Sequence, residues 1–179
     1  MNSANQLTIL YRKITAWNLT LFIFCFILLA LPTLSFAYIV GVESASRKVL
    51  RGDTVVAASE AYITAARNEY ESFQILLTGG EYSGVTLNFT DLVSNDGNAT
   101  IAAENIEWHV VGYVQTTEAS RYGGTPGWYP DPLVPGGSFN VSAGEVQPVW
   151  VTVYVPGGTP AGEYYGQINI SSDGLGSSL

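Results

Sequence analysis

The sequence has 179 residues, of which 15 are acidic and 7 basic, giving a formal net charge of −8. An acidic surface repels phosphate backbones and a single cysteine cannot pair with another, so nucleic-acid partners and a disulfide framework are excluded. Abundant Gly, Thr, Ser, Val and Tyr favour one all-β, extracellular domain, for which we expect no metal and no cofactor.

The first 37 residues have the pattern of a secretory signal peptide. Arg12 and Lys13 form a short basic region, Leu19–Leu31 is uncharged and apolar, and Ser35-Phe36-Ala37 supplies the small residues of a cleavage site. The apolar run is shorter than the roughly 20 residues that span a bilayer, although an uncleaved membrane anchor is the alternative. We therefore predict an apolar signal helix in residues 1–37 and export to the periplasm, the cell surface or the extracellular space.

The rest of the chain predicts an antiparallel β-sandwich, Ig-like or jelly-roll-like, over residues 38–171, with a linker or truncated end at 172–179. The alternation of Phe73, Ile75 and Leu77 with polar residues is typical of a strand that is buried on one side. Arg51-Gly52-Asp53 and Asn95–Asn98 predict turns. The expected strands are Tyr38–Glu43, Tyr62–Ala66, Tyr70–Leu77, Val85–Thr90, Trp108–Gln115, Pro148–Val155 and Glu163–Ser171.

The segment Arg121–Pro135 is too rich in Pro and Gly for a helix or a central strand, so it predicts a long aromatic loop. Its rings could pack against a following domain, pack on the sandwich, or stack on the C–H faces of sugars. Interfaces favour Tyr, Trp and Arg, so domain packing is the preferred interpretation, and it requires Trp128 or Tyr129 to be partly exposed in this chain. The candidate interface or sugar-contact residues are Arg121, Tyr122, Trp128, Tyr129 and Asp131.

Five stretches stand out in order along the chain, namely Ala66–Gln74, Ile106–Val114, Gly127–Leu133, Gln147–Val155 and Thr159–Ile168. Together they resemble the amino-terminal β-sandwich of glycoside hydrolase family 123 and its uncharacterised relatives. The resemblance implies an accessory domain that precedes a TIM-barrel catalytic domain. That barrel would remove terminal N-acetylgalactosamine by substrate-assisted catalysis with an adjacent Asp-Glu pair. This chain has no Asp-Glu or Glu-Asp dipeptide, so no catalytic residue is carried over.

Other residues are candidates for chemistry, and each also has a structural interpretation. Glu107, Glu118 and Asp131 flank the expected central strand and the loop, but no spacing selects a pair of them for glycoside hydrolysis. We interpret them as solvated or turn-forming carboxylates. His109, the only histidine, lacks a nearby Ser nucleophile, Cys or second histidine, so we expect a structural histidine with satisfied hydrogen bonds.

Arg67 and Glu69 lie at the corner before a predicted strand. They would form a local ion pair, or alternatively would clamp a neighbouring domain. Four Asn-X-Ser/Thr sequons would carry glycans only in a host that N-glycosylates exported proteins. The sequon asparagines are Asn88, Asn98, Asn140 and Asn169.

These observations predict a non-catalytic accessory β-sandwich of an exported glycoside-hydrolase-like protein. Its partner would be a carboxy-terminal catalytic barrel that is absent from this chain, with glycans as candidate ligands. Contact with a membrane is expected only through an uncleaved signal segment. A free-standing carbohydrate-binding or surface-adhesion module is the alternative, and a self-sufficient hydrolase is the third and least favoured hypothesis.

Overall fold

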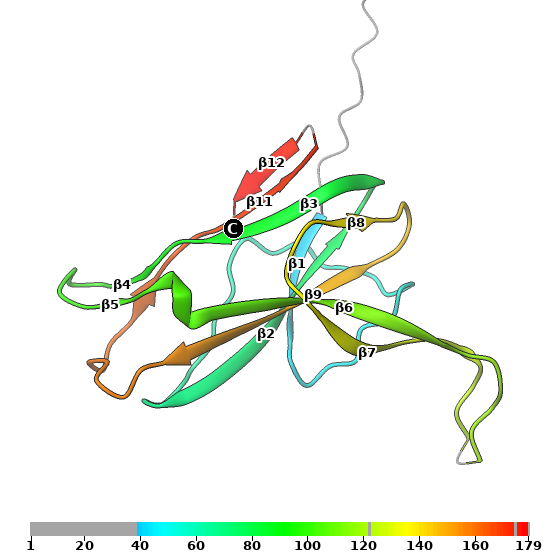
Figure 1. The fold of residues 1–179 in the computed structure, drawn as a ribbon, viewed down its shortest axis with the longest axis horizontal. Coiled ribbons are helices and arrows are strands. Elements are labelled where there is room, and N and C mark those ends of the chain that lie inside the picture. Colours follow the sequence, from blue (N-terminus) through cyan, green and yellow to red (C-terminus); the bar gives the residue numbers. More distant parts are fainter. Residues whose placement is uncertain (1–38, 122, 174, 179) are drawn as a thin grey trace, which may run out of the picture. The chain divides into compact units, whose positions relative to one another are not determined.

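The computed structural model describes residues 39–121, 123–173 and 175–178 (Figure 1). In these ranges the strands pair only in antiparallel fashion, which confirms the predicted all-β antiparallel class. None of the described helices is both long and apolar enough to cross a membrane. The elements are β1 (Ile39–Ser44), β2 (Glu69–Thr78), β3 (Tyr82–Phe89), β4 (Leu92–Ser94), β5 (Thr100–Ile101), a 3-10 helix (Ala103–Asn105), β6 (Ile106–Thr116), β7 (Gly127–Pro135), β8 (Phe139–Val141), β9 (Gln147–Val155), β10 (Tyr164–Tyr165), β11 (Ile168–Ser172) and β12 (Leu175–Ser178).

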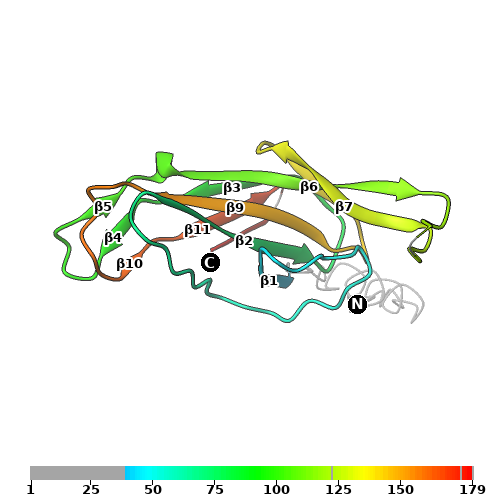
Figure 2. The same cartoon turned by 90° about the horizontal axis from the view of Figure 1, so that it is seen from below.

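The strands form three sheets. The largest has the order β1-β2-β9-β6-β7, and a four-stranded sheet has the order β12-β11-β3-β8. A small sheet, β10-β4-β5, continues from β3 and β11 (Figures 1 and 2). In the largest sheet the non-consecutive neighbours β2, β9 and β6 form the centre, so the β6–β7 hairpin lies at one edge.

One hydrophobic core lies between the two larger sheets. Alternate residues of β2 and β9 point into it, among them the fully buried Ile75, Val149 and Val151. Val85 of β3 and Ile170 of β11 enter the same core from the four-stranded sheet. Each such side chain contributes about 1.5–3 kcal/mol through burial. Two sheets that share one core in this way have the packing that a sandwich requires.

The opposite face of β2 is also covered, which alternation alone did not predict. Leu76 of β2 packs with Val49, Val146 and Val55 in a second, smaller apolar cluster. Gln74, expected on a solvent face, is only 3% exposed. Its side-chain amide donates hydrogen bonds of 2.8 Å to the carbonyls of Ser44 and Arg47. The segment after β1 therefore folds over the largest sheet and is anchored there.

The structure corrects three predicted elements. The expected strand Glu163–Ser171 is divided into β10 and β11, which belong to different sheets. Residues 62–66 were expected to form a strand, but they have no ladder partner in the described chain, and Tyr62 is 81% exposed. Strand propensity without a neighbouring strand and a buried face does not make a strand. Within Arg121–Pro135, the predicted loop is wrong for residues 127–135, which form β7. Its prolines, such as Pro132, are tolerated because β7 pairs only with β6 at the sheet edge.

The sequence also predicted the structure of the two ends of the chain. The apolar signal helix expected in residues 1–37 lies outside the described residues. Residues 172–179, expected to be a linker or truncated end, include β12, which pairs with β11 from Asn169 to Ser172.

Candidate functional site

The β6–β7 hairpin is the element on which the candidate residues gather. It extends past its neighbours in the sheet (Figure 1), and its connection is closed by its own hydrogen bonds. Thr116 accepts from the Gly127 amide at 3.1 Å, and the Tyr129 hydroxyl donates to the Thr125 carbonyl at 2.8 Å. Nearer the tip, the Gly124 amide donates to the Ser120 hydroxyl at 3.0 Å. The hairpin is therefore an ordered projection.

Arg51 fixes the hairpin against the segment that follows β1. Its guanidinium carbon lies 4.2 Å from the ring centroid of Trp128 and 4.9 Å from that of Tyr113. Its Nη1 pairs with Glu145 at 3.4 Å, and its carbonyl accepts from the Val146 amide at 2.8 Å. Cation–π contacts contribute about 0.5–1 kcal/mol when exposed and about 2 when desolvated. A planar cation close to both rings thus holds the half of the hairpin that adjoins its connection.

Tyr113 also fixes the hairpin against this segment. Its hydroxyl donates to the Val49 carbonyl at 3.1 Å. Burial, the largest influence, raises the pKa of Tyr113 to about 12, although the nearby charge of Arg51 acts in the opposite direction. The phenol is therefore neutral at physiological pH and serves as a hydrogen-bond donor. A second cation contact accompanies the first, because Lys48 Nζ lies 5.5 Å from the Tyr129 ring centroid.

The sequence-predicted hairpin residues have different surroundings. Trp128 meets Arg51 and is still 43% exposed, so the partial exposure expected of an interface residue is observed. Tyr129 is half-buried, whereas Arg121 and Asp131 are exposed. Tyr122 lies outside the described residues. The structure therefore brings Trp128 and Tyr129 to basic residues of a distant segment rather than to their neighbours in the sequence.

Sequence reasoning did not identify Arg51, Lys48 or Tyr113 as part of this site. One signal was available, because three of the five basic residues beyond residue 37 fall within residues 47–51. The predicted turn at Arg51-Gly52-Asp53 is confirmed by the Asp53 amide, which donates to the Leu50 carbonyl at 3.1 Å.

Exposed apolar side chains lie on both faces of the hairpin. Val114 is 45% exposed, Leu133 45% and Val134 50%. Val114 pairs with Tyr129 and Val110 pairs with Val134, so Val114 and Val134 share the face of Tyr129. Leu133, opposite Val111, shares the other face with Trp128. Clustered exposed apolar groups next to aromatic rings are typical of surfaces that bind another protein surface.

The three candidate carboxylates do not converge on one point. Glu107 lies near the start of β6, whereas Asp131 lies beside the register shift that follows Val111. At about 3.3 Å per residue, about 15 Å of strand separates them. Glu118 lies beyond Thr116, the last residue of β6, and is farther away still. Paired carboxylates in glycosidases are about 5–9.5 Å apart, so these exposed residues do not form such a pair.

His109 lies within the largest sheet, opposite Trp150 of β9 and Pro135 of β7. Its buried Nδ1 has no hydrogen-bond partner in the described part of the chain, so the expected satisfied histidine is wrong in this respect. Pro135 has no side-chain polar atom to offer. Among the described residues, no group of three or more His, Cys, Asp or Glu side chains could hold a metal ion.

The structure shows the surroundings of the corner before β2 and of the four sequons. Arg67 and Asn68 form the turn before β2, and the Glu69 carboxylate accepts from the Ala66 amide. The ion pairs of the described chain involve other residues, so the expected ion pair between Arg67 and Glu69 is not formed.

All four sequon asparagines are exposed. They are Asn88, Asn98, Asn140 and Asn169.

Comparisons with known proteins agree with this fold. A family model described as the glycoside hydrolase 123 N-terminal domain matches residues 51–172. A family 123 glycoside hydrolase from Clostridium perfringens, solved to explain the details of glycolipid glycan hydrolysis, is similar in structure with a TM-score of 0.67 and 18% identity. The match covers 79% of this chain but 25% of that chain, so this chain spans about a quarter of the enzyme's length. No curated protein sequence matches this chain.

Proposed function

Because the chain belongs to the glycoside hydrolase 123 N-terminal domain family, we propose that it is the non-catalytic accessory domain of an exported glycoside-hydrolase-like protein. The match of the family model to residues 51–172 carries this proposal. Hydrolysis of glycolipid glycans, described for the Clostridium perfringens enzyme, is the activity that we propose for the whole protein. Catalysis would then reside in a separate barrel domain, which agrees with the separation of Glu107 from Asp131.

The role of the domain in this proposal is to brace the catalytic domain through the β6–β7 hairpin. Two observations support it. Leu133 on the Trp128 face and the two valines on the Tyr129 face, Val114 and Val134, expose apolar surface, and interfaces are enriched in aromatic residues. Arg51 holds the Trp128 ring before any partner binds, so little side-chain entropy is lost on docking.

The proposal can be tested on a longer protein that contains this domain and a catalytic barrel from the same coding region. Val134→Glu and Val114→Glu would place a charge in the docking surface, and Val56→Glu, at a position that is exposed and outside the hairpin, is the matched control. Differential scanning calorimetry would follow the barrel, and release of sugar from a glycolipid would follow activity. We expect the two hairpin variants to lower the unfolding temperature of the barrel and the rate of hydrolysis.

Two results would contradict the proposal. A coding region without a catalytic domain would remove the partner itself. Hairpin variants that behave like Val56→Glu would show that the domain does not brace the barrel through this surface.

A further inference from the structure

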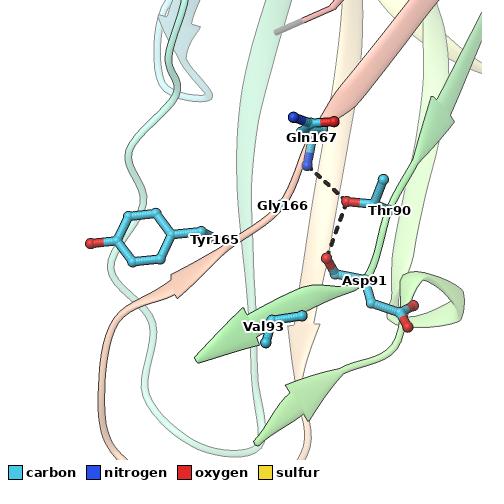
Figure 3. Close-up of a pocket in the computed structure, with 6 residues that line it drawn as sticks. All are labelled: Thr90, Asp91, Val93, Tyr165, Gly166 and Gln167. Carbon is cyan, nitrogen blue, oxygen red and sulfur yellow. Dashed lines mark hydrogen bonds between the residues drawn. The ribbon is translucent and has the colours of Figure 1, made fainter. Parts of the chain in front are cut away.

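A shallow hollow lies at the other end of the domain, away from the β6–β7 hairpin. It has a volume of about 570 Å³ and opens between the end of β3 and the connection from β10 to β11 (Figure 3). The residues that line it are Thr90, Asp91, Val93, Tyr165, Gly166 and Gln167.

The backbone around the hollow is held in place by hydrogen bonds. Thr90 accepts from the Gln167 amide through its hydroxyl at 2.8 Å, and its own amide donates to the Gln167 carbonyl at 3.0 Å. The Thr90 hydroxyl in turn donates to the Asp91 carbonyl at 3.1 Å. A side chain at Gly166 would come within 2.7 Å of Leu92 and 2.9 Å of the Asp91 carbonyl, so glycine permits this close approach. The backbone on both sides of the hollow is therefore held in a fixed position by the fold.

One wall of the hollow is apolar and exposed. Tyr165 of β10 pairs with Val93 of β4, so their side chains lie next to each other on one face of the small sheet. Tyr165 is 57% exposed and Val93 is 41% exposed. The Tyr165 hydroxyl donates to a Glu163 carboxylate oxygen at 2.9 Å, which restrains the ring. A ring held at the surface without being buried is available to a ligand.

The opposite wall is polar. Figure 3 shows Gln167 and Thr90 on the other side of the β10–β11 connection from the Tyr165 ring. The side-chain amide of Gln167 offers two donors and an acceptor. The lining contains no Lys or Arg and so offers no positive charge to an anionic ligand, while the Asp91 carboxylate accepts from the Ala103 amide at 2.8 Å.

We propose that this hollow binds an uncharged sugar ring. The apolar C–H face of the sugar lies on Tyr165 and Val93, and its hydroxyl groups bond to Gln167 across the hollow. Sugars have one apolar face and a polar rim, which is the combination that the two walls offer. The site is separate from Arg121–Pro135, and the inference does not depend on the presence of a catalytic domain.

The test is an NMR titration of the full 179-residue chain, labelled with 15N, with methyl glycosides of neutral hexoses and N-acetylhexosamines at millimolar concentrations. We expect saturable shifts for the amides of residues 90–93 and 165–167. Methyl glucuronide, which carries a carboxylate on a similar ring, is expected to bind more weakly than methyl glucoside. Absence of saturable shifts, or shifts confined to the β6–β7 hairpin, would overturn the proposal.

Variants locate the site more closely. Tyr165→Ala should raise the dissociation constant at least about tenfold, whereas Tyr165→Phe keeps the ring and should change it little. Gln167→Ala provides a second test that leaves the apolar wall intact and should also weaken binding. Tyr70→Ala is the control, because its ring is also exposed but lies on β2, outside the lining of the hollow. Unchanged affinity in Tyr165→Ala and Gln167→Ala, or loss of binding in Tyr70→Ala with the fold intact, would refute the assignment. Success or failure here is independent of whether the hairpin braces a catalytic barrel.

Discussion

Replacing Arg51 with alanine removes the cation that lies close to the rings of Trp128 and Tyr113. The guanidinium is 4.2 Å and 4.9 Å from the two ring centroids, and its side chain is 31% exposed. Two partly desolvated cation–π contacts together contribute about 2 kcal/mol. The 3.4 Å ion pair with Glu145 adds little, since that carboxylate side chain is 42% exposed. We therefore expect Arg51→Ala to lower the free energy of unfolding by about 2 kcal/mol, and the unfolding temperature by about 8 °C.

Urea unfolding of a double-mutant cycle measures this contact directly. Arg51→Ala and Trp128→Ala, alone and combined, should give a coupling free energy of about 1 kcal/mol. Arg67→Ala is the matched control, because Arg67 is an exposed arginine in a turn and forms none of the ion pairs or cation–π contacts of the described chain. If the effects of Arg51→Ala and Trp128→Ala on the free energy of unfolding add to within about 0.3 kcal/mol, the two side chains do not stabilise each other and the proposed contact is refuted.

Two further predictions concern packing and pH. A Cβ at Gly136 would lie 2.6 Å from the Trp108 ring and 2.8 Å from its carbonyl oxygen, whereas a Cβ at Gly137 would meet nothing. Gly136→Ala should cost about 1–3 kcal/mol in urea unfolding and Gly137→Ala about zero, and equal costs would contradict the packing. Because burial raises the pKa of Tyr113 to about 12, its contribution to stability is complete below about pH 10 and is lost as the pH rises through 12. Between about pH 10 and pH 12, the unfolding temperature should fall less steeply with pH in Tyr113→Phe than in the unmodified protein. The same slope in both proteins would contradict a raised pKa of Tyr113 in the folded state.

The central strands could be predicted from the sequence because local alternation determines which side chains enter the core. Phe73, Ile75 and Leu77 of β2 occupy the expected face, and the valines of β9 do the same. Burial of Gln74 could not be predicted in this way. It depends on a segment 27 to 30 residues earlier that supplies the carbonyl acceptors.

The candidate site was predictable only in part for the same reason. The rings of Arg121–Pro135 stand out by composition, and Trp128 is exposed as an interface residue should be. Their cation partner, Arg51, is distant in sequence and lies in a segment for which the sequence predicted only a turn. The prolines suggested a loop because an edge strand, which tolerates missing amide donors, has no distinctive sequence pattern.

Hydroxyl-radical footprinting tests the central claim, that a catalytic domain covers the hairpin, most directly. The oxidation rate of Trp128 would be compared between this chain and a longer protein that carries the barrel, with the exposed Tyr165 as an internal reference. The account predicts that Trp128 is strongly protected in the longer protein while Tyr165 is oxidised at the same rate in both. Equal oxidation of Trp128 in the two proteins would contradict it.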